Sequence, residues 1–257
     1  GNVGQIKLIE GDIYNYELVE KIVADSDIII NLVGILFEKK RFDFVKTHSQ
    51  FPEFLGKIAS QHDIEHLIHI SALGIDRDDK TNYAKTKLNG EEALQAAYPQ
   101  ATILRPSIVF GTEDNFFNQF ADMSKLSPIL PLIGGGETKF QPVYVDDVAK
   151  AIEAVLLSEN SKGEIYELGG PDVMSFKEIL QYILKITERQ RILLYMPYSL
   201  TTIIACFAEL LPTPLITKDQ LKALQTDNIT SGKYKSFFDL SIQTTNVKEI
   251  VPQYLNS

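Results

Sequence analysis

The chain has 257 residues, of which 44% are hydrophobic and 23% charged, a composition that excludes an intrinsically disordered protein. Its formal net charge of −9 argues against a nucleic-acid partner, because neutralising phosphates requires a basic surface. The single cysteine, Cys206, excludes an intramolecular disulfide and a cysteine-based zinc site.

Strands and helices alternate along the first half of the chain. In chain order we predict strands at 5–13, 27–34, 66–71 and 101–111, and helices at 14–26, 42–61, 83–97 and 114–123. The segment 27–34, DIIINLVG, is a continuous apolar run, which is typical of a strand buried on both faces. This alternation with short connections predicts βαβ units, whose right-handed crossovers build a doubly wound parallel sheet.

The second half mixes short elements with loops. We predict a short strand leading into a helix over 141–157, and a strand, turn and helix over 163–180. Ser175 is the predicted N-cap of that last helix, with Glu178 three residues later. The glycines at 134–136 have no following lysine or helix start, so we interpret them as a turn rather than a phosphate-binding loop.

An apolar segment at 192–212 is the one candidate for membrane contact. It contains Pro197 and Glu209, which a spanning helix tolerates poorly, so we expect no transmembrane segment. Six apolar residues share one face at helical spacing: Leu200, Ile203, Ile204, Phe207, Ala208 and Leu211. We interpret this stripe as a core or partner-packing surface; contact with a larger membrane-associated assembly is the alternative.

One pair of residues carries the chemistry. YAKTK places Tyr83 and Lys87 four residues apart on one face of a predicted helix. A lysine ammonium favours the phenolate and lowers its pKa, so Tyr83 can act as general acid or base while Lys87 holds a ribose hydroxyl. The preceding strand ends at Ser71, at the carboxyl edge where open α/β sheets bind ligands. There its hydroxyl polarises the same substrate oxygen or, alternatively, is bonded by the backbone.

The histidines do not form a predicted metal site. His62, His66 and His69 are close in sequence, but residues three apart on a strand point to opposite faces. No nearby carboxylate or cysteine completes a ligand set, so no metal is expected.

Several motifs, in this order, resemble the extended and atypical short-chain dehydrogenase/reductase superfamily, the NAD-dependent epimerase/dehydratase family. They are Gly11-Asp12-Ile13, NLVG at 31–34, Ser71 in HISALG, Tyr83 with Lys87, and LRPSIVFG at 104–111. Further motifs resemble one subgroup, the dehydrogenase-like accessory subunit of respiratory complex I and its bacterial relatives. These are SALGIDRD, EDNFFNQFA (113–121), GGGETKFQPVYVDDVA (134–149), YELGGPDV (166–173) and ITKDQLKALQTDN (216–228).

The resemblance implies roles for individual residues. Tyr83, Lys87 and Ser71 would be catalytic, and Tyr83 and Lys87 would also hold the nicotinamide ribose. The other implied cofactor contacts are Asp12 and Ile13 at the adenine, Val33 and Gly34 at the adenosine ribose, and Pro106, Ser107 and Ile108 at the nicotinamide carboxamide. For Asp12 the alternative is a simple turn or helix cap. We interpret Arg105, Asp146 and Asp147 mostly as packing and capping groups.

Two features depart from the family pattern. Members open with a strand, a G-x-x-G-x-x-G turn, a helix and a second strand, and that turn holds the cofactor pyrophosphate. This chain starts at Gly1 with what would be the third strand, so we expect it to be N-terminally truncated, without the residue that separates NAD from NADP. At 46–49 it has KTHS where extended members carry Asn-x-x-Gly, which leaves their active-site asparagine and its proton relay unassigned.

We therefore predict the α/β class, with a Rossmann-type parallel sheet lacking its first two strands and a small, mostly helical C-terminal region. The partial NAD(P)-binding domain would span 1–157, with strand contributions from 163–170, and the C-terminal region 171–257. In a sheet ordered 3-2-1-4-5-6, the absent strands leave a gap of roughly 14 Å between 5–11 and 27–33. We expect these two segments to pair directly, because pairing satisfies their backbone groups; otherwise the first lies loosely against the body.

Three hypotheses for function remain. The first is an NAD(P)-dependent reductase or epimerase with Tyr83 as acid/base, assisted by Lys87 and Ser71. The second is a non-catalytic accessory or assembly subunit of the complex I type with a structural nucleotide, and the third is a truncated copy without a competent cofactor site. The cofactor is NAD or NADP, with NADP slightly favoured. Further partners are an unidentified small-molecule substrate and a respiratory-complex partner bound through 200–211. The expected location is the bacterial cytoplasm, peripheral to the inner membrane, or the mitochondrial matrix side in a eukaryote.

Overall fold

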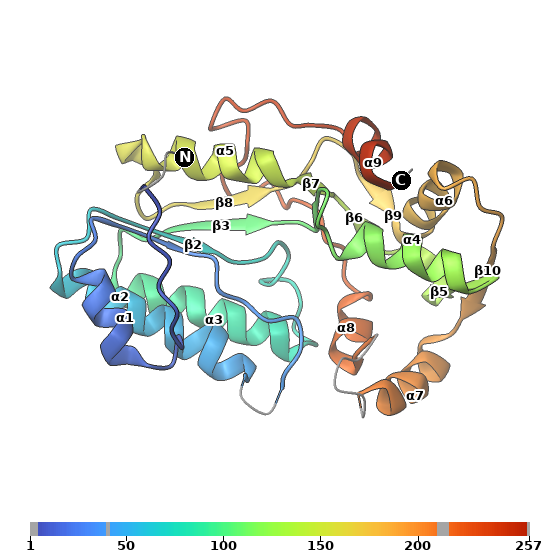
Figure 1. Cartoon of the computed structure of the whole chain (residues 1–257), viewed down its shortest axis with the longest axis horizontal. Helices are drawn as coiled ribbons and strands as arrows, with labels where there is room; N and C mark the ends of the chain where they lie inside the picture. Colours follow the sequence, from blue (N-terminus) through green and yellow to red (C-terminus); the bar gives the residue numbers. More distant parts are fainter. Residues whose placement is uncertain (1–4, 40–41, 210–215, 256–257) are drawn as a thin grey trace.

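A four-stranded parallel sheet forms the centre of the computed structural model, which describes residues 5–39, 42–209 and 216–255 (Figure 1). The strands are β1 (Ile28–Asn31), β2 (His66–Ile70), β3 (Thr102–Pro106) and β8 (Ile165–Leu168), in the order β1-β2-β3-β8. All three pairings are parallel. This confirms the predicted parallel α/β sheet.

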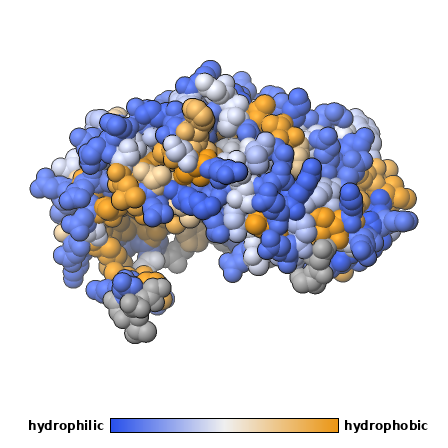
Figure 2. All heavy atoms as spheres, turned by 90° about the horizontal axis from the view of Figure 1, so that it is seen from above, coloured by the Kyte–Doolittle hydropathy of each residue, from blue (hydrophilic) through white to orange (hydrophobic). Residues whose placement is uncertain are grey.

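Helices cover both faces of this sheet (Figure 1). On one face lie α1 (Tyr16–Val23), the π-helical segment η1 (Val45–Gln50) with its continuation α2 (Phe51–Gln61), and α3 (Asn82–Ala97); on the other lies α5 (Val145–Leu156). Successive strand residues alternate between the two layers: Leu67 packs in the cluster of α2, and Ile68 in that of α5. Seen from above, from the side of α5, the surface is largely hydrophilic with scattered apolar patches (Figure 2).

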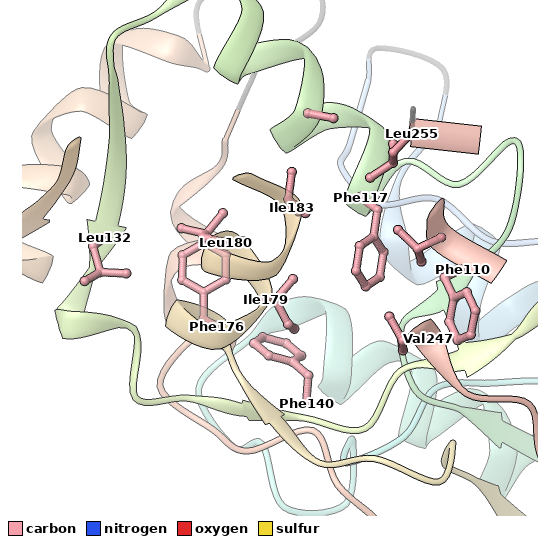
Figure 3. Packing of buried hydrophobic residues seen from close by; sticks show 12 residues of the cluster. Phe110, Phe117, Leu132, Phe140, Phe176, Ile179, Leu180, Ile183, Val247 and Leu255 are labelled. Atoms are coloured by element: carbon pink, nitrogen blue, oxygen red, sulfur yellow. The ribbon is translucent and has the colours of Figure 1, made fainter. Parts of the chain in front are cut away.

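A further hydrophobic cluster, which we call the α4–α6–α9 cluster, lies beyond the carboxyl edge of the sheet (Figure 1), and its packing is shown in Figure 3. It joins α4 (Phe116–Leu126), α6 (Phe176–Ile186) and α9 (Val247–Leu255), and Phe117, Phe176 and Val247 are among its buried members. The predicted N-cap of α6 is confirmed, because Ser175 and Glu178 form a reciprocal capping box.

Short strands and helices complete this part of the chain. The parallel pairs are β4 (Val109–Phe110) with β7 (Val143–Tyr144), and β5 (Ile129–Ile133) with β10 (Ile192–Met196). The strands β6 (Lys139–Phe140) and β9 (Met174–Ser175) pair antiparallel. The helices are η2 (Gly134–Gly136), η3 (Glu159–Ser161), α7 (Tyr198–Ala208) and α8 (Lys218–Ala223). Of the helices described, none is both long and apolar enough to cross a membrane.

The predicted first strand is wrong. Residues 5–11 are exposed, with Leu8 92% accessible, and within the described chain they form no ladder with β1. The expected direct pairing therefore does not occur. Residues 5–11 are exposed, so water can hydrate their backbone groups. Only buried backbone groups must find a partner within the protein, and this requirement therefore does not force residues 5–11 onto β1.

The burial of β1 also differs from the prediction. Ile29 and Asn31 are buried, whereas Ile28 and Ile30 remain 43% and 41% exposed. The expected strand buried on both faces is thus half-buried. It lies at the edge of the sheet, where one face has less cover than at the centre.

The apolar stripe of α7 does not face the core of this chain. Leu200, Ile203 and Ile204 are 45 to 56% exposed, while Thr201 and Ala205 are buried. Ala205 packs against Ile133 and Leu221, so the small residues form the inward face and the branched ones point outward. The core-packing interpretation is wrong for these three residues. The side chain of Phe207 and all of Leu211 lie outside the described residues.

Candidate functional site

Helix α3 holds Tyr83 and Lys87 beneath the carboxyl end of β2. Its N-cap is Thr81, whose side chain accepts from the backbone N–H of Ala84 at 3.1 Å. Lys87 is almost fully buried, and its Nζ donates to the carbonyl of Ile70 at 3.3 Å. The same Nζ lies 5.8 Å from the ring centroid of Tyr83, so the structure brings the predicted pair together.

Ser71 follows β2 directly and presents a hydroxyl that nothing in the described chain satisfies. Its N–H donates to the carbonyl of Leu104 at 2.7 Å, whereas its Oγ is buried without a hydrogen-bond partner. The alternative that the backbone bonds this hydroxyl is therefore wrong. A buried polar atom without a partner is uncommon and marks a place that a polar ligand can fill.

His48 belongs to this site, although the sequence analysis assigned it no role. It lies in the KTHS segment, which forms the π-helical turn η1. Its Nε2 accepts from the N–H of Ile35 at 3.1 Å, and its Nδ1 lies 3.3 Å from Thr86 Oγ1. The ring also meets the ring of Tyr83 edge-on, with centroids 5.2 Å apart. Irregular π-helical turns are frequent at functional sites, but sequence periodicity does not reveal them.

Gly90 makes this arrangement possible, and a second glycine, Gly34, lies beside it. A Cβ at Gly90 of α3 would lie 1.8 Å from the carbonyl oxygen of His48, so α3 and η1 approach this closely only because residue 90 has no side chain. A Cβ at Gly34 would lie 3.7 Å from Lys87 Nζ and 3.9 Å from His48 Nε2. The loop after β1 therefore passes directly over the lysine and the histidine.

Burial dominates the electrostatics of the site. It lowers the pKa of Lys87 to about 8, an effect that Glu91 partly opposes, and it raises the pKa of Tyr83 to about 12. The expectation that Lys87 lowers the pKa of Tyr83 is therefore wrong, because burial disfavours the phenolate and raises this pKa. Burial also lowers the pKa of His48 and of His69 to about 3, so both rings are neutral at physiological pH. The site thus offers a phenol that donates a hydrogen bond and a lysine that is only partly charged above neutral pH.

The residues expected at an adenosine lie at the turn before α1 and in the loop after β1. The Asp12 carboxylate accepts from the N–H of Tyr14 at 3.1 Å, and the Asp12 carbonyl accepts from the N–H of Asn15. These two bonds form a turn, the alternative role that we gave for Asp12. Ile13 and Val33 are partly buried against the cluster of α2. Asn31 Oδ1 accepts from the N–H of Val33 at 3.1 Å and shapes this loop.

The residues expected at a nicotinamide follow β3. Pro106 ends that strand, and Ile108 packs on the α4–α6–α9 cluster. Ser107 Oγ donates to Asn228 Oδ1 at 2.6 Å, and the amide of Asn228 donates to the carbonyl of Leu73 at 2.7 Å. Asn228 is thus a second residue of this region without a predicted role.

The packing interpretation of Arg105 and Asp147 is confirmed. Arg105 is buried in a bidentate ion pair with Glu91, with Nη2 to Oε2 at 2.5 Å, and it stacks on Tyr234. Asp147 is fully buried and accepts from the N–H of Thr245 at 2.6 Å. Asp146 lies exposed in the first turn of α5. Within the described ranges no group of three His, Cys, Asp or Glu could hold a metal ion.

Comparison with known proteins shows the family to which this sequence belongs. The profile of the "NAD dependent epimerase/dehydratase family" matches residues 1–169. The chain is 34% identical to the mitochondrial "NADH dehydrogenase [ubiquinone] 1 alpha subcomplex subunit 9" of Arabidopsis thaliana, covering 99% of this chain and 66% of that protein. It is 28% identical to the mitochondrial "NADH-ubiquinone oxidoreductase 40 kDa subunit" of Neurospora crassa, covering 100% of this chain and 68% of that one. The chain thus spans about two thirds of the length of these relatives.

The fold has counterparts among solved structures. A UDP-glucuronic acid 4-epimerase from Bacillus cereus, in complex with UDP-glucuronic acid and NAD, superposes with a TM-score of 0.68 at 20% identity. The match covers 95% of this chain and 80% of that one. At this identity the likeness shows the fold alone.

Proposed function

The chain belongs to the NAD dependent epimerase/dehydratase family, and from this premise we propose that it is a dinucleotide-binding accessory subunit of a respiratory NADH dehydrogenase complex. The observation that carries the proposal is the extent of the alignments. Relatives named as subunits of that complex in a plant, a fungus and the mouse match 99%, 100% and 95% of this chain. The names of the plant and fungal relatives include the word mitochondrial, and we propose a location on the matrix side of a mitochondrial membrane or, in a bacterium, in the cytoplasm at the inner membrane.

The residues at the site suit one half of a dinucleotide. The unpartnered Ser71 hydroxyl, the buried Lys87 and the Tyr83 phenol would hold the nicotinamide ribose, with Pro106, Ser107 and Ile108 beside the carboxamide. When bound, the nicotinamide ring would supply hydride chemistry. Asp12, Ile13, Val33 and Gly34 would line the adenosine side. Of the two dinucleotides we favour NADP, on the subgroup resemblance.

The outward face of α7 supports the accessory role. Leu200, Ile203 and Ile204 present branched apolar side chains to solvent, and neighbouring β10 adds Ile192 and Leu194. Large exposed apolar patches on a protein mark protein–protein or membrane interaction sites. We propose that this face docks on another subunit of the complex.

Co-migration with the complex tests the proposal. The tagged protein should run with the respiratory complex on native gels of membranes from its source organism, and Ile203→Asp should release it. Thr202→Asp, exposed on α7 outside the stripe, is the matched control. Tyr83→Phe should leave both co-migration and nucleotide retention intact. A protein that never co-migrates contradicts the accessory role.

A reductase or epimerase is the second candidate. It is favoured by the proximity of Tyr83 and Lys87 at the end of β2, together with the free Ser71 hydroxyl. Under this hypothesis Tyr83→Phe abolishes turnover, because the phenol is the acid/base. The same variant thus separates the two functions.

A further inference from the structure

The motif ITKDQLKALQTDN contributes Asn228 to the site, and a second of its residues, Asp219, reaches the site from the far end of the sequence. Asp219, in the first turn of α8, accepts two backbone hydrogen bonds from the start of α3. The N–H of Asn82 donates to Oδ1 at 3.0 Å and the N–H of Tyr83 to Oδ2 at 2.9 Å. Both oxygens of one carboxylate therefore hold the turn that carries Tyr83.

The start of α3 needs such a partner. The first N–H groups of a helix have no acceptor within the helix, and the helix dipole places partial positive charge there. Thr81 satisfies only Ala84, so the donors of Asn82 and Tyr83 depend on Asp219. A carboxylate at this position both completes the hydrogen bonds and lies at the favourable end of the dipole.

Asp219 is itself held in place. A reciprocal capping box of Thr217 and Gln220 begins α8, and Leu221 is buried against Ala205 and Ile133. A few residues later, Asn228 bonds the loop after β2 through Leu73 and the loop after β3 through Ser107. The segment 217–228 therefore fixes three pieces of backbone that surround the site.

We infer that Asp219 is a positioning residue for Tyr83, and that residues 217–228 act as a clamp between the C-terminal region and the Tyr83–Lys87 helix. Where it concerns a bound dinucleotide, the inference rests on the proposed function. With the clamp in place, the phenol keeps its edge-on contact with His48 and its orientation toward Lys87. Without it, the first turn of α3 frays and carries the phenol away.

Hydrogen exchange of the Tyr83 amide tests the clamp without any ligand. In the whole chain, Asp219→Ala should speed this exchange about tenfold, which corresponds to about 1.4 kcal/mol and is typical of losing a hydrogen bond to a charged group. Asp219→Asn keeps one acceptor oxygen, so its Tyr83 amide should exchange at a rate between those of the wild type and Asp219→Ala. Asp79→Asn is the matched control, because Asp79 is exposed and lies just before the same helix. Amides of β2 and β3 should be unaffected in all three variants.

Two further readouts keep the result interpretable. ¹⁹F NMR of 3-fluorotyrosine at position 83 should shift and broaden in Asp219→Ala and recover in part in Asp219→Asn. If the wild type binds NADPH, the affinity for NADPH should fall from wild type to Asp219→Asn and further to Asp219→Ala. An unchanged Tyr83 amide, or exchange that rises equally throughout the chain, overturns the clamp. A wild-type chain that fails to bind NADPH counts against the dinucleotide alone and leaves the amide test standing.

Discussion

Replacing Lys87 with methionine should stabilise the folded chain at neutral pH. Burial lowers the pKa of this lysine from 10.5 to about 8, so below pH 8 the folded chain holds a buried ammonium at a cost. At about 1.4 kcal/mol per pH unit, the shift corresponds to about 3 kcal/mol. Methionine also loses the hydrogen bond from Nζ to Ile70, worth about 1 kcal/mol. We therefore expect a net gain of about 2 kcal/mol at pH 7.

The sign of the pH dependence makes this prediction specific. Between pH 8 and 10.5 the unfolded chain binds the lysine proton and the folded chain does not, so wild-type stability rises with pH over this window. The advantage of Lys87→Met should therefore shrink above pH 8 and approach zero near pH 9.5. Below pH 8 it should stay constant.

Urea denaturation at pH 6.5, 7.5, 8.5 and 9.5 measures the difference. Lys85→Met, on the same helix but exposed, is the matched control and should show no pH-dependent difference. A Lys87→Met chain that is less stable than wild type by the same amount at every pH would refute the reasoning. The lysine would then be stabilising through packing and hydrogen bonding rather than costly through desolvation.

Three other predictions follow from the site and its support. Glu91→Ala should lower the free energy of unfolding by about 3–5 kcal/mol in urea titrations, because it leaves the buried Arg105 guanidinium without its main partner; a loss below 1 kcal/mol contradicts this. The chain should bind NADH or NADPH in calorimetry, because the free Ser71 hydroxyl and the buried Lys87 are placed to hold a nicotinamide ribose; no heat of binding at millimolar dinucleotide would contradict the proposed cofactor. Lys87→Met should abolish any reductase activity and weaken dinucleotide binding, and an activity that stays intact would show that the Tyr83–Lys87 pair is not catalytic.

Local sequence patterns were sufficient for the sheet and for part of the site. The apolar runs at β1, β2 and β3, and the helical spacing between them, predict a parallel α/β sheet because each strand must be covered by the helix that follows it. The four-residue spacing of Tyr83 and Lys87 places both on one face of α3, and the end of β2 places Ser71 nearby. These features depend on neighbours within a few residues, which the sequence shows directly.

What only the tertiary structure decided depends on contacts between distant segments. Burial, rather than the neighbouring ammonium, sets the pKa of Tyr83, and no spacing along α3 reveals that burial. His48 enters the site because Gly90 lets two helices touch, and Asp219 reaches Tyr83 across 136 residues of chain. The apolar stripe of α7 predicts a core face, yet in the structure Ala205 packs against Leu221 and Ile133, while Leu200, Ile203 and Ile204 remain exposed. A hydrophobic period shows that a face is apolar, but what covers it is set by the shape of the surface it meets.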